Sequence, residues 1–178
     1  MTNNEVSPDE QLYTAMMGIP GWYEALQNGQ EFPAAQYGVG AGRIVSSILL
    51  AAGDDAEPIA VAGKLQEDRT GWLVVVYASL IVSVDVTQLN NDGFEYATDV
   101  HFPRDLSDLS VISGHSYYNG INGRPRHRGM QFTFTLAGKP VHMFSAHHYN
   151  NSSLITDDAI YAAYVSLRDS AAGMTSRR

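Results

Sequence analysis

The sequence predicts an α+β fold: an antiparallel sheet or partly open barrel of about six to seven strands, with short N-terminal helices and a C-terminal helix. Residues 130–136 alternate apolar and polar side chains, the period of a strand with one buried face. Residues 156–172 begin with Thr156 and two aspartates and carry apolar residues at helical spacing, which is typical of an amphipathic helix. With 178 residues, of which 44% are hydrophobic, the chain can form a core.

The N-terminal part predicts short helices. Ser7 and Pro8 form a favourable helix start, and Gly18 ends that helix. A second helical stretch is expected over residues 21–27, and a third over residues 43–52, where apolar side chains fall on one helical face. A strand over residues 43–52 is the alternative, because Ile and Val are equally common in sheets.

The middle of the chain predicts hairpins. A polar turn at residues 66–71 separates two apolar runs, and the long run from Trp72 to Val86 is expected to break near Ala78 and Ser79. Residues 90–93 form a strong turn signal. Further strands are expected over residues 109–112, 130–136 and 141–145.

This pattern divides the chain into three parts. Residues 1–40 are expected to be an N-terminal helical appendage or linker, residues 41–173 the α+β domain, and residues 174–178 a disordered tail. The glycine-rich stretch at 38–42 lacks the third glycine and the lysine of phosphate-binding loops, so we interpret it as a flexible linker.

Composition narrows the possible functions. The chain has no cysteine, so disulfides, thiolate nucleophiles and iron–sulfur clusters are excluded, and we expect no cofactor. The start of the sequence is polar and acidic, unlike a secretory signal, and the most apolar run, residues 73–84, is too short for a membrane helix, so we expect a cytoplasmic protein without a transmembrane segment. Residues 1–100 hold 14 acidic and 3 basic residues, and residues 101–178 hold 5 and 8. The net charge of −8 disfavours nucleic acid as a partner.

Four stretches carry a family resemblance: GWLVVVYASLIVSVDV, FPRDLSDLSVIS, GMQFTFTLAGKPVHMF and TDDAIYAAYVSLRDS. From about Ile59 to Ala172 their order resembles the bacterial pleckstrin-homology-like (PH-like) domains. The resemblance implies a sheet closed by a C-terminal helix and a binding function. Members that bind phosphoinositides place basic residues around the first hairpin turn, whereas here Lys64 and Arg69 flank two acidic residues.

A basic loop is the best binding candidate in the sequence. Arg124, Arg126, His127 and Arg128 lie close together, and guanidinium groups bind phosphate or carboxylate with two parallel hydrogen bonds. The alternative is a solvated loop whose charge offsets the acidic half of the chain.

The histidines suggest a second candidate. His142, His147 and His148 could form a metal site with Asp157 or Asp158, although 142 and 148 would stand about 20 Å apart in an extended strand. Ser113, His115 and Asp108 could form a hydrolytic triad on paper, but no nucleophile motif frames the serine. We therefore expect no catalytic residues.

The first functional hypothesis is a non-catalytic interaction module that binds a protein partner or itself through a sheet edge or a loop. The alternatives are an anionic-lipid or membrane-surface binder that uses Arg124, Arg126 and Arg128, and a small metal-dependent enzyme that uses the histidines of the C-terminal half.

Overall fold

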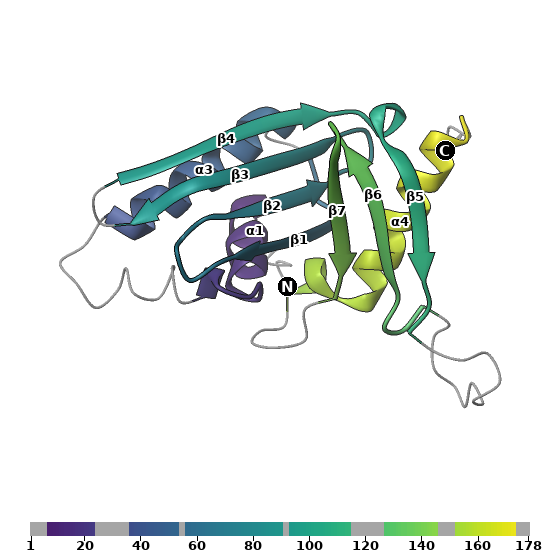
Figure 1. Ribbon diagram of the computed structural model, residues 1–178, viewed down its shortest axis with the longest axis horizontal. Helices are drawn as coiled ribbons and strands as arrows, with labels where there is room; N and C mark the ends of the chain where they lie inside the picture. Colours follow the sequence, from purple (N-terminus) through teal and green to yellow (C-terminus); the bar gives the residue numbers. More distant parts are fainter. Residues whose placement is uncertain are drawn as a thin grey trace, which may run out of the picture.

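The computed structural model describes residues 7–23, 36–53, 56–90, 93–114, 127–145 and 152–173 (Figure 1). The helices in these ranges are α1 (Pro8–Met17), α3 (Gln36–Ala52), α4 (Asp157–Ala171) and the 3-10 turns η1 (Pro103–Asp105) and η2 (Ser153–Ile155). The strands are β1 (Ala60–Leu65), β2 (Gly71–Val76), β3 (Ile81–Asn90), β4 (Gly93–His101), β5 (Ser107–Ile112), β6 (Gln131–Leu136) and β7 (Lys139–Phe144).

The strands form two antiparallel sheets. The first has the order β1-β2-β3-β4 and the second the order β5-β6-β7. The strands of the second sheet cross those of the first at a steep angle, and the two sheets do not close into a barrel (Figure 1). The mixed α+β class, the antiparallel pairing and the C-terminal helix are confirmed, whereas the strands divide between two sheets.

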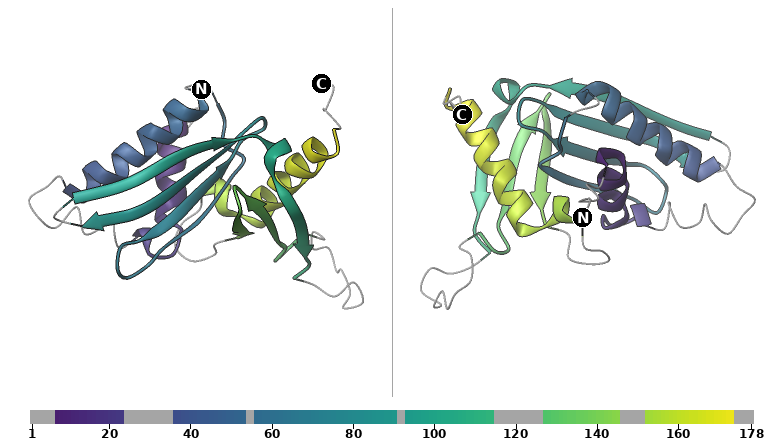
Figure 2. Two further views of the ribbon diagram at one scale, coloured as in Figure 1. Left: turned by 45° about the horizontal axis from the view of Figure 1, so that its top comes forward. Right: turned by 180° about the vertical axis from the view of Figure 1, so that it is seen from behind.

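Two helices cover one face of the first sheet. The right-hand view of Figure 2 shows this face, with α1 over β1 and β2 and α3 along β3 and β4. Because side chains alternate along a strand, this face receives Leu73 and Val75 from β2 and Val82 and Val84 from β3. They pack in one buried cluster with residues of α1, α3 and η2. The first sheet is therefore covered on this side.

The second core lies between the other face of the first sheet, the second sheet and α4. Phe132 and Phe134 of β6 are fully buried there, as the period-two pattern predicts. From α4, Ile160 and Leu167 reach the same cluster. Thr156 caps α4, because its hydroxyl oxygen accepts a hydrogen bond of 3.2 Å from the backbone N–H of Ala159.

The glycine-rich stretch corrects one expectation. Residues 38–42 belong to the helix α3, so the flexible-linker interpretation is wrong. Gly40 is buried, and a methyl group on its Cα would come within 2.9 Å of Leu89 and 3.4 Å of Phe94. The missing side chain lets the helix backbone approach β3 and β4 closely. The helix expected over residues 43–52 is confirmed and the strand alternative is excluded.

The N-terminal helix contributes to the core. Leu12 and Met16 of α1, with Trp22 after it, are fully buried in the first cluster. The backbone N–H of Leu65 also donates a 3.1 Å hydrogen bond to the carbonyl of Pro20. The boundary proposed at residue 40 stays a prediction, and the tail over residues 174–178 lies outside the described residues.

The expected hairpins are confirmed. Leu65 pairs with Gly71 and Val76 with Ile81, so the long apolar run does break near Ala78. Strand β4 was not expected from the sequence, although its pairing of Asn90 with Gly93 fits the turn signal. None of the helices in the described part of the chain has the length and apolar character needed to cross a membrane.

Candidate functional site

Strand β4 forms a free edge of the first sheet. It pairs with β3 on one side, and no strand pairs with its other side within the described ranges. Figure 1 shows it as the long outermost strand of this sheet. None of its residues is buried, from Gly93 to His101. An edge strand of this kind exposes unpaired N–H and C=O groups that can pair with another extended chain.

One face of β4 is acidic. Because side chains alternate, Glu95, Ala97, Asp99 and His101 point to the same side of the sheet, away from α1 and α3. Glu95 and Asp99 are exposed, and the small side chain of Ala97 lies between them in sequence. This edge strand has no Lys or Arg in its nine residues. The edge therefore presents two carboxylates on one side.

A groove of about 600 Å³ adjoins this acidic face. Its floor is the first sheet, with Trp72 of β2, and its wall is the turn between β6 and β7. Lys139 extends from that turn and forms an ion pair with Asp85 of β3. The hydrogen bond from Lys139 to Asp85, together with the negative charge of Asp85, raises the pKa of Lys139, and the charge of Asp99 adds to this effect.

A serine and a histidine also meet in the groove. The Ser83 hydroxyl and His101 Nε2 lie 2.9 Å apart across β3 and β4. A hydrolytic serine would need nearby backbone N–H groups to stabilise an oxyanion. Ser83 lies in β3, which is paired on both sides to β2 and β4. We therefore interpret this contact as a cross-strand hydrogen bond that holds β4 in register.

The opposite face of β4 packs on α3 and is aromatic. Phe94 and Tyr96 are half-buried against the first core cluster. The Tyr96 hydroxyl lies 2.9 Å from the hydroxyl of Ser47 on α3, and the Arg43 guanidinium lies 4.8 Å from the centre of the Phe94 ring. Further along, Val100 is 44% exposed. The strand is thus acidic on one side and apolar on the other.

Strand β5 is an edge of the second sheet, but it is less regular. Its pairing with β6 shifts between Ser107 and Ser110, and Asp108 has a positive φ of 57°. Bulges of this kind disrupt the pairing and protect an edge. Only Ser110, Val111 and Ile112 keep a continuous register. The pairing of β3 with β4 also shifts once, but there the extra residue, Thr87, lies on β3, so β4 offers the longer continuous edge.

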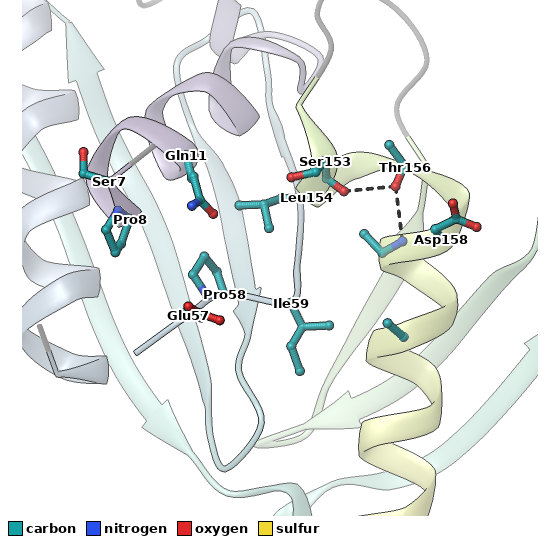
Figure 3. Close-up of a pocket in the computed structure, with 12 residues that line it drawn as sticks. Ser7, Pro8, Gln11, Glu57, Pro58, Ile59, Ser153, Leu154, Thr156 and Asp158 are labelled. Carbon is teal, nitrogen blue, oxygen red and sulfur yellow. Dashed lines mark hydrogen bonds between the residues drawn. The ribbon is translucent and has the colours of Figure 1, made fainter. Parts of the chain in front are cut away.

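A larger cavity of about 890 Å³ lies between the beginnings of α1 and α4 (Figure 3). Among the described residues, its lining includes the carboxylates of Glu57 and Asp158 and neither Lys nor Arg. Figure 3 shows Thr156 hydrogen-bonded to the Ser153 carbonyl and to the first turn of α4. The two carboxylates disfavour an anionic ligand at these helix N-termini.

The structure describes only part of the basic loop. Arg124 and Arg126 lie outside the described residues, and Arg128 is exposed. His127 Nε2 lies 2.5 Å from the Asp158 carboxylate, and its ring stacks on Tyr161 with 4.5 Å between ring centres. These contacts attach the end of the loop to α4. The ligand-binding role of this loop stays a prediction.

The histidine candidates are not brought together in the described part of the chain. His142 is exposed on β7, opposite Thr133 of β6, whereas His147 and His148 lie outside the described residues. Within the described ranges no group of three His, Asp or Glu side chains is placed to hold a metal ion. Of the triad considered on paper, His115 also lies outside them. The metal-dependent alternative stays a prediction.

Sequence reasoning missed the acidic edge because it did not recognise β4. The available signal was the alternation of Phe94 and Tyr96 with Glu95 and Ala97 after a strong turn.

Comparison with known proteins gives no independent guide to the function, since the chain matches no family model and no curated protein.

Proposed function

We propose that this chain is a protein-binding module that takes up an extended segment of a partner protein as an added strand beside β4. The observation that carries the proposal is the free edge of β4, nine residues long and without a buried residue. Strand addition supplies affinity through main-chain hydrogen bonds and specificity through alternate side chains. It needs no change in the fold, because the acceptor edge already exists.

The element order supports a PH-like assignment as part of the same proposal. Seven antiparallel strands are followed by a C-terminal helix, in the order that the sequence resemblance implies. Fold alone does not determine a function, so the proposal depends on the edge strand. In this chain α1 and α3 cover one face of the first sheet, and the second sheet and α4 cover part of the other, which leaves the β4 edge and the groove beside it for a partner.

Photo-crosslinking of selected peptides tests this function. Peptides that bind the full chain would first be selected from a display library of short extended sequences. A photo-reactive phenylalanine analogue would then replace either Val100 of β4 or Val111 of β5, two valines with matched exposures of 44% and 48%. We expect crosslinks from position 100 and none from position 111.

The opposite pattern would move the binding site to β5 and contradict the proposal. A library that yields no peptide with concentration-dependent binding would also contradict it.

A further inference from the structure

We infer that the partner segment is a strand in which basic and apolar residues alternate, an inference that rests on the proposed function. The two faces of β4 determine this pattern. Glu95 and Asp99 mark the groove face, and Tyr96 and Val100 mark the opposite face. A strand beside β4 continues both faces, because each of its residues lies level with one residue of β4.

The spacing of the carboxylates sets the spacing of the basic residues. Glu95 and Asp99 are four positions apart on one face, so the residues opposite them are also four positions apart. Between these two positions, the residues level with Tyr96 and Thr98 face the apolar side. The inferred pattern is therefore basic, apolar, any residue, apolar, basic, and it holds for parallel and antiparallel addition.

Neighbouring strands lie about 4.8 Å apart, so a lysine on the added strand reaches the carboxylate of Glu95 or Asp99 directly. It does not need to displace Lys139, because Asp85 lies one strand further into the sheet. Lys139 nevertheless provides a precedent on this face, where a lysine from one segment pairs with an aspartate of another. The Asp99 carboxylate has no hydrogen bond or ion pair to another side chain of the described part.

The charges of the chain favour the same partner. Residues 1–100, which contain β4, hold 14 acidic and 3 basic residues. Arg43, a basic residue on the apolar side of β4, lies over Phe94 and away from the carboxylates. Complementary charge raises the rate of association and excludes partners of like charge. Two carboxylates on an edge can also prevent pairing between copies of the chain, since like charges opposite each other are destabilising.

A series of peptides that differ only in the charge of two residues tests the inference. The probes are fluorescently labelled Thr-Lys-Val-Thr-Val-Lys-Thr and the same peptide with Gln or Glu in place of Lys. Binding to the full chain would be measured by anisotropy, and amide NMR would locate each peptide. We expect shifts in β4 with the Lys peptide and weaker binding in the order Lys, Gln, Glu.

Two double variants test whether binding depends on charge pairs formed at β4 or only on the net charge of the chain. Glu95→Gln with Asp99→Asn should weaken binding of the Lys peptide about tenfold, from two cross-strand charge pairs. Glu57→Gln with Asp108→Asn removes two exposed carboxylates elsewhere and should change the affinity less than about twofold.

Equal weakening by both double variants would overturn the inference, because net charge alone would then explain the binding. Peptides that bind β4 equally well with Lys, Gln or Glu would also overturn it while supporting the proposed function. Shifts confined to residues outside β4 for every peptide would overturn both.

Discussion

The ammonium group of Lys139 pairs with the carboxylate of Asp85, which joins the β6–β7 turn to the third strand of the first sheet. The side chains are 69% and 40% exposed, so solvent screens the pair and it contributes little to stability. Its main consequence is electrostatic. Lys139 neutralises the Asp85 carboxylate on the face where β4 presents Glu95 and Asp99.

Replacing Lys139 with Gln should therefore strengthen binding of a basic strand. The variant removes a cation from the groove face and leaves the two carboxylates of β4 unchanged. We expect affinity for the Lys peptide to rise about twofold at low salt, and the gain to shrink as salt screens the charges. Anisotropy titrations at two salt concentrations measure this. An unchanged or lower affinity for the Lys139→Gln variant would disagree with our account of this face.

The contribution of α1 to the core can be measured with neighbouring residues. Leu12 is fully buried and Tyr13 is 39% exposed. Leu12→Ala should lower the free energy of unfolding by about 2–5 kcal/mol, and Tyr13→Ala by less than about 1 kcal/mol. Urea unfolding measures both. Similar small losses for the two variants would mean that α1 is an appendage, as the boundary at residue 40 supposes.

The buried Tyr77 should make stability fall at high pH. Burial raises its pKa to about 12 from the ordinary value of 10.0, and its hydroxyl has no hydrogen-bond partner in the part of the chain described. The folded state therefore binds this proton more tightly than the unfolded state. Its contribution is complete below pH 10 and is lost as pH rises toward 12.

Tyr77→Phe should remove this dependence. Because it also removes an unpaired buried hydroxyl, the variant should gain about 1 kcal/mol at neutral pH. Urea unfolding from pH 9 to pH 12 follows both chains, and the gap between them should widen above pH 10. A gap that stays constant over this range would refute the assignment to Tyr77.

Alanine substitutions at two glycines separate the cost of a left-handed backbone from the cost of a steric clash. Gly21 has φ +82°, and a Cβ there would lie 1.8 Å from the Leu65 carbonyl oxygen; Gly53 has φ +94° and open space around it. Gly53→Ala should cost about 1–2 kcal/mol from the left-handed conformation alone. Gly21→Ala should cost at least about 2 kcal/mol more, because the chain must also shift. Thermal or urea unfolding decides, and equal losses would contradict the close approach of residues 20–21 to β1.

The elements predicted correctly from the sequence depend on local signals. The cap at Thr156 and the helical spacing of Ile160 and Leu167 lie within one segment, as does the alternation of Phe132 and Phe134. Short turns between apolar runs gave the hairpins of β1 with β2 and β6 with β7. These elements could be predicted because the hydrogen bonds and buried side chains that stabilise each of them lie within a short stretch of the sequence.

The missed features depend on distant contacts. The helix through residues 38–42 is stabilised by packing of Gly40 against Leu89 and Phe94, which overrides the low helix propensity of glycine. The candidate site requires that β4 lie at the edge of its sheet and that one face of β4 carry the carboxylates. The edge position of β4 is determined by the order of the strands in the sheet. That order cannot be obtained from the alternation of Glu95 with Tyr96 alone.

Hydrogen exchange of β4 tests the central claim most directly. The exchange of backbone amides would be followed with and without a saturating peptide selected on the full chain. The account predicts that exchange slows at alternate amides between Gly93 and His101, those that face away from β3, while Ser107–Ile112 is unchanged. Slowing confined to Ser107–Ile112, or no slowing in β4 at saturation, would contradict it.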